Sequence, residues 1–85
     1  MEWDENKSRW NREMRGFGFE IVDEFDWGAA IIEEDFRKDY GERRFRAFGW
    51  AGDLRLVVAF TLRNGDIRII SVRRMHTKEA TKYGI

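Results

Sequence analysis

The stretch from Leu54 to Arg74, LRLVVAFTLRNGDIRIISVRR, carries the clearest secondary-structure signal in the chain. Its first ten residues are rich in β-branched and aromatic side chains, which favour strands. The dipeptide Asn64-Gly65 then predicts a two-residue hairpin turn, because such turns need positive φ at both positions. Alternating apolar residues resume directly after the turn. The stretch therefore predicts an antiparallel hairpin, and apolar residues on both faces predict that it is central in the sheet.

The turn also predicts the register of the hairpin. Leu62 should face Ile67, and Phe60 should face Ile69. An uninterrupted ladder continues with four further pairs, Ala59–Ile70, Val58–Ser71, Val57–Val72 and Leu56–Arg73, and places Thr61 opposite Arg68. Three arginines in one strand, at 68, 73 and 74, are more than a core strand needs. They either form a solvated face or bind something negatively charged.

The N-terminal residues predict two helices. Asp4 is a suitable N-cap for a helix to Met14 or Arg15, and Gly16 is a natural end. The spacing of its larger side chains predicts an inner stripe of Trp3, Lys7, Trp10 and Met14, with both Trp residues in the core. The segment FEIVDEFDW predicts a second short helix that buries Phe19, Val22 and Phe25.

Two further strands and a last helix complete the prediction. AAIIEED (29–35) and ERRFRAFGW (42–50) have strand patterns, and HTKEATKYGI predicts a short terminal helix capped by Thr77. The predicted fold is α+β: two N-terminal helices, an antiparallel sheet of about four strands and a short C-terminal helix, in one domain of residues 1–85.

Composition narrows the functional class. The chain has 85 residues, 42% of them hydrophobic, and no Cys, so neither a disulfide framework nor a thiolate metal site is expected. Glu33 to Asp35 have no converging His, so we expect no metal or cofactor. No apolar run is long enough for a membrane helix, and the N-terminus is too polar for a signal peptide. We expect a soluble cytoplasmic protein.

The net charge of zero hides an asymmetry. Residues 1–42 hold six Lys or Arg and thirteen Asp or Glu, a charge of −7; residues 43–85 hold ten and three, a charge of +7. The basic half predicts contact with a phosphate backbone or an acidic protein, and the acidic half should confine nucleic acid to one side. An acidic partner segment would then cover the basic half, with apolar contacts at residues such as Phe48 or Trp50.

Several motifs together resemble the BrnT family, the toxins of bacterial BrnT/BrnA toxin–antitoxin pairs. WDENKSRWNREMRGFGFE (3–20) is similar to the family pattern W-D-x-x-K-x-x-x-N-x-x-K-H-G-V-x-F-E, and RIISVRRM (68–75) to R-I-I-S-A-R-x-A. Further matches are Glu42, Arg44 and Gly49 in GERRFRAFG, and Glu79 and Tyr83, where the family reads E-R-x-x-Y. The chain departs from the family at Met14-Arg15, which replace a Lys-His pair.

The resemblance implies a RelE-like microbial ribonuclease fold and an endoribonuclease toxin. It also implies a cognate BrnA-like antitoxin with a ribbon-helix-helix DNA-binding domain, which neutralises the toxin in a heterotetramer and alone contacts DNA. RNA needs no metal to be cut, because its 2′-hydroxyl can attack the adjacent phosphorus. The enzyme must neutralise charge and move protons, and arginine suits the first task.

These considerations select the candidate residues. The catalytic candidates are Arg73, Glu79, Tyr83 and Arg44, with arginine on the phosphate, Glu79 as a base if its surroundings tune its pKa, and Tyr83 orienting or stacking on a base. The RNA-binding candidates are Arg74, Arg46, Lys7, Trp50 and Lys78.

Structural explanations stand beside these assignments. Arginines at strand ends can extend into water, and Glu79 and Tyr83 can belong to an ordinary solvated helix with a packed Tyr. The stem of Lys7 can lie along tryptophan rings, and the only histidine, His76, is typical of a surface or capping residue. The missing Lys-His pair keeps open a rival function, that of a catalytically impaired binding protein acting as antitoxin partner and operon co-repressor.

Overall fold

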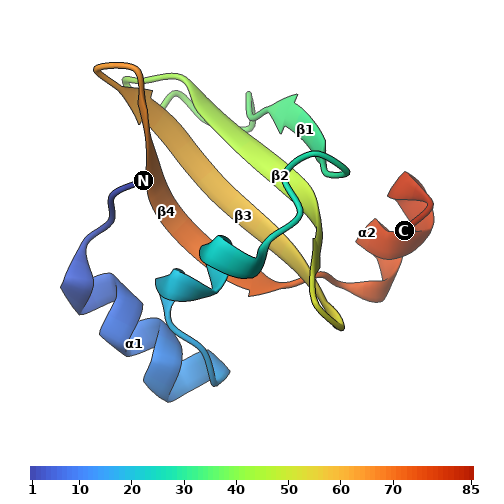
Figure 1. The fold of residues 1–85 in the computed structure, drawn as a ribbon. Helices are drawn as coiled ribbons and strands as arrows, with labels where there is room; N and C mark the ends of the chain where they lie inside the picture. Colours follow the sequence, from blue (N-terminus) through green and yellow to red (C-terminus); the bar gives the residue numbers. More distant parts are fainter.

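The computed structural model describes residues 1–85 and has the α+β architecture that the sequence predicts (Figure 1). Its elements are α1 (Glu5–Arg15), the 3-10 helix η1 (Phe19–Glu24), β1 (Ile31–Glu34), β2 (Arg44–Ala51), β3 (Leu54–Arg63), β4 (Asp66–Arg74) and α2 (Thr77–Tyr83). The antiparallel sheet of four strands is confirmed. The second predicted helix is a 3-10 helix of six residues and not an α-helix.

The strand order is β1-β2-β3-β4, so β3 is central but β4 lies at an edge. The prediction of a wholly central hairpin is therefore wrong. The edge of β4 is covered near its start by the N-terminal residues instead of by another strand. The Glu2 N–H donates to the Ile67 carbonyl at 2.9 Å, and the Ile69 N–H donates to the Glu2 carbonyl at 2.8 Å. This pairing satisfies edge groups that would otherwise be open to another chain.

The register of the hairpin changes part-way along. Asn64 and Gly65 both have positive φ, and the pairs Leu62–Ile67 and Phe60–Ile69 are as predicted. Ile70 is then an extra residue, so that Ala59 pairs with Ser71 and the remaining predicted pairs are wrong. Each residue farther along β4 is displaced by one position, listed in order as Val72 opposite Val58, Arg73 opposite Val57 and Arg74 opposite Leu56.

The bulge at Ile70 has a clear physical reason. An uninterrupted ladder would place Ser71 and Arg73 on the face that carries Leu56 and Val58, both of which are fully buried. The extra residue moves Val72 to that face, where it is also fully buried, and turns Arg73 to the opposite face. The bulge thereby keeps a charge out of the core.

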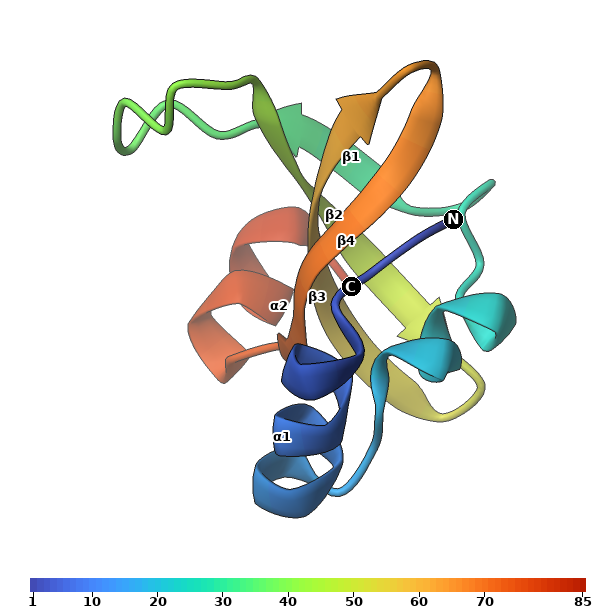
Figure 2. The same cartoon turned by 90° about the vertical axis from the view of Figure 1, so that its left-hand side faces the viewer.

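The main core lies between one face of the sheet and η1. Phe19, Val22 and Phe25 are buried there, as predicted, against side chains from β2, β3 and β4. Gly49 on β2 allows this contact, because a Cβ at that position would lie only 3.0 Å from the ring of Phe25. The opposite face is partly covered by α2, so helical segments lie on both sides of the sheet (Figure 2).

Helix α1 packs with a different stripe from the predicted one. Its buried residues are Ser8 and Asn11, whereas Trp10 is 51% exposed, Met14 is 67% exposed and Lys7 is exposed. The reason is hydrogen bonding to the backbone. The Ser8 Oγ accepts from the Phe19 N–H at 2.8 Å, and the Asn11 Nδ2 donates to the Phe17 carbonyl at 2.9 Å.

The predicted ends of the helices are largely confirmed. Asp4 caps α1 by accepting from the Asn6 N–H at 2.8 Å, and Gly16 ends it at φ 89°. Helix α2 is capped by His76 and not by Thr77. No helix in the structure is long and apolar enough to cross a membrane.

The polar inner face of α1 leads to a stability prediction. We expect Asn11→Ala to lower the free energy of unfolding by about 1–3 kcal/mol, because it leaves the Phe17 carbonyl without its partner. Met14→Ala on the same helix should change it by less than about 0.5 kcal/mol. Urea unfolding of both variants measures this. A larger loss for Met14→Ala than for Asn11→Ala would contradict the observed packing.

Candidate functional site

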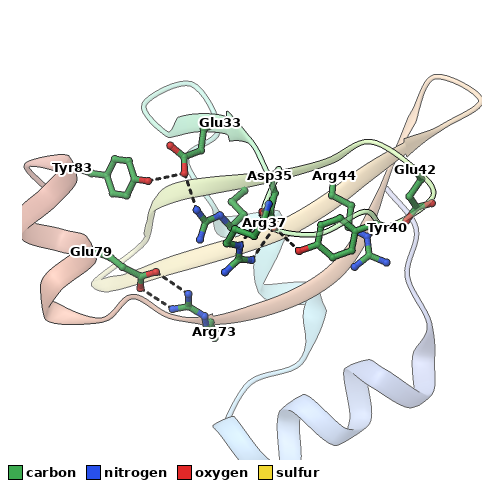
Figure 3. A network of polar contacts seen from close by, with 10 residues as sticks. Glu33, Asp35, Arg37, Tyr40, Glu42, Arg44, Arg73, Glu79 and Tyr83 are labelled. Carbon is green, nitrogen blue, oxygen red and sulfur yellow. Dashed lines mark hydrogen bonds and ion pairs between the residues drawn. The ribbon is translucent and has the colours of Figure 1, made fainter.

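Arg73 and Glu79 form a two-pronged ion pair where β4 leads into α2. The Nη1 and Nη2 groups of Arg73 donate to the two carboxylate oxygens of Glu79, each at 2.8 Å (Figure 3). Arg73 reaches Glu79 because the bulge turns it to the face that α2 covers. Glu79 also accepts from the N–H of His76 at 2.8 Å, so its carboxylate caps the first turn of α2. Two predicted catalytic residues are thus in direct contact.

This contact makes Glu79 a stronger acid, not a better base. The Arg73 guanidinium, and after it the N–H of His76, hold the pKa of Glu79 down at about 2 against the opposing effect of burial. A general base works best with a pKa near the working pH. The upward tuning that a role as base requires is absent while the pair is closed.

Tyr83 belongs to a second network, which it shares with Glu33 and Arg46. Its hydroxyl donates to the Glu33 carboxylate at 2.7 Å, and the Nη2 of Arg46 donates to the same oxygen at 2.8 Å. The ring of Tyr83 stacks on buried Phe48 at 4.1 Å. Burial, and then the Glu33 carboxylate, raise the pKa of Tyr83. Tyr83 is therefore fixed in place by β1 and β2.

Glu33 was missed by sequence reasoning as a member of the site. The signal that could have found it is the strand pattern, since Glu33 pairs directly with Arg46 across β1 and β2. Arg46 also has a buried Nε without a hydrogen-bond partner, the sole buried side-chain nitrogen or oxygen in this state. Such an unmade bond is costly, and it marks a donor that an additional acceptor could satisfy.

Arg44 does not join Arg73. It lies in the cross-strand row with Thr61 and Arg68, whereas Arg73 lies in the row with Phe48, four residues farther along β2. At the usual rise per residue this separates the two rows by about 13 Å. The structure therefore does not bring Arg44 together with Arg73, Glu79 and Tyr83, and its role in catalysis stays a prediction.

Arg44, the first residue of β2, instead contacts the loop that joins β1 and β2. Its Nε donates to Glu42 at 3.2 Å, and its guanidinium lies 4.2 Å from the Tyr40 ring (Figure 3). Tyr40 in turn donates to buried Asp35, which also accepts three bonds from Arg37, one from its backbone N–H and two from its side chain. These bonds, first of all those from Arg37, hold the pKa of Asp35 far below its usual range. The loop thus holds Arg44 in a structural network.

The remaining RNA-binding candidates lie on separate parts of the molecule. Arg74 is on the opposite sheet face from Arg73, with its guanidinium 5.2 Å from the Phe17 ring. Trp50 is 43% exposed at the end of β2, 5.5 Å from the Arg55 guanidinium. Lys7 is exposed on α1 and Lys78 on α2. They do not form one continuous site.

The fold brings part of the acidic half against the basic half. Carboxylates of the acidic half pair with arginines of the basic half, in the ion pairs Glu2–Arg68, Glu33–Arg46, Glu34–Arg43, Glu42–Arg44 and Glu42–Arg63. The two halves are therefore not fully separate, and the expectation that nucleic acid meets only one side stays a prediction. Phe48 also has no exposed surface, so it cannot be a contact for a partner, whereas Trp50 can. No three His, Asp or Glu side chains come together as metal ligands.

Comparison with known protein families shows to which family the chain belongs. The model of the family described as ribonuclease toxin, BrnT, of type II toxin-antitoxin system, matches residues 3–79, a range that includes both Arg73 and Glu79. The chain belongs to the BrnT family. The resemblance seen in the sequence is thus confirmed, and membership implies a ribonuclease toxin with an antitoxin partner. No curated protein matches the chain significantly.

The lowered pKa of Glu79 predicts a pH-dependent contribution to stability. A depressed pKa stabilises the fold above the ordinary value of 4.5 and loses that effect as the pH falls toward about 2. We expect Glu79→Gln to cost about 1 kcal/mol at pH 7, after allowance for solvent screening, and progressively less below pH 4.5.

Denaturant unfolding across this pH range measures the difference between the two proteins. Glu24→Gln is the control, because Glu24 is exposed and forms no ion pair. A Glu79→Gln deficit that stays constant down to about pH 2 would rule out the Arg73 pair as its source.

Proposed function

We propose that the chain is a metal-independent endoribonuclease toxin that cuts RNA through attack of the 2′-hydroxyl on the adjacent phosphorus. The observation that carries this proposal is the Arg73–Glu79 pair at the junction of β4 and α2. The guanidinium is held in a fixed direction, and the fork it presents to two carboxylate oxygens fits two phosphate oxygens equally well. The proposal includes a RelE-like ribonuclease fold for the chain and the cytoplasm as its place of action.

The first step of the proposed mechanism is an exchange of anions. The two side chains are 26% and 18% exposed, so an RNA phosphate can approach the pair from solvent. The phosphate takes the place of the Glu79 carboxylate on Arg73. Release from Arg73 removes the largest cause of the lowered pKa of Glu79, which then rises toward its ordinary value. Substrate binding thereby creates the base that the closed pair lacks.

The chemical step then needs one proton acceptor and one proton donor. Glu79 takes the proton of the 2′-hydroxyl as its oxygen bonds to phosphorus. The Nδ1 of His76 lies 3.5 Å from Glu79, and its side chain is 71% exposed, so His76 can give a proton to the departing 5′-oxygen. The products are a 2′,3′-cyclic phosphate and a 5′-hydroxyl. Arg73 stabilises the additional charge on the phosphorane between these two steps.

Tyr83 and Arg46 have supporting roles in this proposal. Because Tyr83 bonds to Glu33 and stacks on Phe48, it holds α2, and with it Glu79, against β1 and β2. The buried Nε of Arg46 is available to an acceptor if Glu33 shifts. Both are positioning residues, since neither faces the reacting atoms in the closed state.

For the antitoxin we propose a BrnA-like protein with a ribbon-helix-helix domain, which alone contacts DNA and assembles with the toxin as a heterotetramer. Trp50 supports a place for it. The ring is 43% exposed on the face of β2 that also carries Arg46, and exposed tryptophans of this kind often contribute most to protein interfaces. An acidic segment with an apolar residue at Trp50 would fit this end of the sheet.

The rival function, a binding protein and co-repressor without catalysis, is favoured by one specific observation. Arg73, Glu79, Tyr83 and Arg44 are all engaged with partners inside the chain. If the closed pair never opens to RNA, the protein retains only its surface for an antitoxin. The two experiments that follow separate these functions.

The direct experiment is cleavage of a labelled single-stranded RNA in EDTA. We expect cutting by the wild-type protein and a loss of about 10²–10³-fold in Arg73→Ala, because one preorganised charge on the transition state is removed. Arg63→Ala is the matched control, since Arg63 is 52% exposed and pairs loosely with Glu42 at 3.7 Å. Equal rates in Arg73→Ala and wild type would exclude the Arg73 site. No cutting by any folded variant would favour the rival function.

The exchange step makes a second, opposite pair of predictions for Glu79→Ala. Removal of the competing carboxylate frees Arg73, so affinity for a non-cleavable 2′-O-methyl RNA should rise by about tenfold. Cleavage of the same sequence with 2′-hydroxyls should fall by about 10²–10⁴-fold, because the base is lost. Fluorescence anisotropy and gel assays measure the two effects, with Glu42→Ala as control. Weaker binding by Glu79→Ala would contradict anion exchange.

A further inference from the structure

A second cationic surface lies where α1 meets the end of β4. Arg15 and Arg74 meet here, and neither forms an ion pair with a carboxylate, unlike most arginines of the sheet. The Nη1 of Arg74 donates to the carbonyl of Arg15 at 3.1 Å, so the two side chains are adjacent. We call Trp10, Met14, Arg15, Phe17 and Arg74 the α1–β4 surface.

Hydrogen bonds fix the two guanidinium groups in place but use only some of their N–H donors. Arg15 uses its Nη1 for two bonds, to the Asn11 Oδ1 at 3.1 Å and to the Val72 carbonyl at 3.0 Å. Its Nε and Nη2 make no hydrogen bond within the chain, and the same holds for the Nε and Nη2 of Arg74. An arginine uses these nitrogens together when it binds an anion in two-pronged fashion. Both residues therefore offer a fixed, unneutralised fork.

Aromatic rings lie directly beside these charges. The Arg15 guanidinium is 5.0 Å from the Trp10 ring, and that of Arg74 is 5.2 Å from Phe17. Trp10 is 51% exposed and Met14 67% exposed, so this part of α1 presents apolar surface to solvent. Unpaired arginines interleaved with an exposed aromatic ring are the features with which proteins hold single-stranded nucleic acid.

We propose that the α1–β4 surface binds single-stranded RNA, with Arg15 and Arg74 on backbone phosphate and the open face of Trp10 stacked on a base. The inference rests on the proposed function, since it gives a binding surface to the part of the RNA strand that continues beyond the phosphate cut at Arg73. Arg73 and Arg74 are consecutive in an edge strand and face opposite sides of the sheet. A strand of RNA that passes around this edge reaches both residues within a short distance.

RNA fits this surface better than an acidic protein segment does. The residues here include no carboxylate, and the C-terminal end of α1 already carries partial negative charge that the two arginines more than offset. A phosphodiester chain supplies both required chemistries at regular spacing, an anion for each fork and a flat base for Trp10. Capping of the α1 C-terminus occupies only the Nη1 of Arg74, so its Nε and Nη2 are free to bind a phosphate.

Fluorescence anisotropy with a short 2′-O-methyl single-stranded RNA, titrated at several salt concentrations, tests the surface. We expect Trp10→Leu to weaken binding by about tenfold with the salt dependence unchanged, because stacking is not electrostatic. Arg74→Gln should weaken binding and reduce the slope of log K against log salt by about 0.7, the value for one phosphate contact on a single strand. Arg9→Gln, the same charge change on the exposed side of α1, should leave both quantities unchanged.

Unfolding midpoints equal to that of the wild type show that each variant is folded. Unchanged RNA affinity in both Trp10→Leu and Arg74→Gln overturns the proposal. If these variants keep RNA affinity but lose the antitoxin, the surface binds protein and the proposal is likewise overturned.

Cleavage of the same sequence with 2′-hydroxyls separates this inference from the proposed function. Loss of binding in the variants together with a wild type that does not cut leaves the surface in place and removes the catalytic proposal. If the wild type cuts RNA and the variants bind RNA as well as the wild type does, the catalytic proposal stands and the α1–β4 surface is excluded as an RNA site.

Discussion

The bulge at Ile70 is the constraint on which the rest of the functional geometry depends. Without the extra residue, alternation along β4 would turn Ser71 and Arg73 into the core beside Leu56 and Val58. Burying an unpaired guanidinium costs far more than one bulge. The insertion therefore follows from the need to bury Val72, and it has a second effect. It presents Arg73 to α2 on one face of the sheet and Arg74 to α1 on the other face. A single bulge therefore places two cationic side chains on opposite sides of the same strand.

The second organising interaction is the pairing of charges within the chain. Carboxylates from the acidic half pair with five of the eight arginines of the basic half, which reduces repulsion among those arginines. The same pairing means that an RNA ligand competes with groups already in place. Affinity at Arg73 is then the difference between a phosphate and the Glu79 carboxylate, not the full attraction of a free guanidinium.

Much of the fold could be predicted from local sequence signals. The turn at Asn64-Gly65, the cap at Asp4 and the buried face of Phe19, Val22 and Phe25 depend on neighbouring residues, and the structure has all of them. The inner face of α1 could not be predicted, because spacing alone ranks Trp10 and Met14 above Ser8 and Asn11. Those two polar residues are buried by bonds to a distant backbone, which no periodicity reveals.

The site was predicted less completely for a related reason. Arg73 and Glu79 lie six residues apart, on either side of the connection between β4 and α2. Their contact could therefore be predicted from the sequence. Glu33 and Tyr83 are 50 residues apart, and their hydrogen bond depends on how β1 pairs with β2 and on where α2 docks. Arg44 was grouped with Arg73 because both are arginines and both match the family pattern, and the cross-strand rows separate them.

The closed Arg73–Glu79 pair also bears on how such a site discriminates among anions. A ligand must match two oxygens to the fork, or it gives up one hydrogen bond that Glu79 already supplies. A monatomic anion such as chloride cannot make that match, whereas a phosphodiester can. Yet a single phosphate only replaces one good partner by another, so the net gain at Arg73 is small. A long polyanion gains more, because contacts at Arg15, Arg74 and Trp10 add to the exchange without displacing any carboxylate. On this argument the internal pair selects for a strand over a mononucleotide, and the second surface supplies the free energy that opens the first.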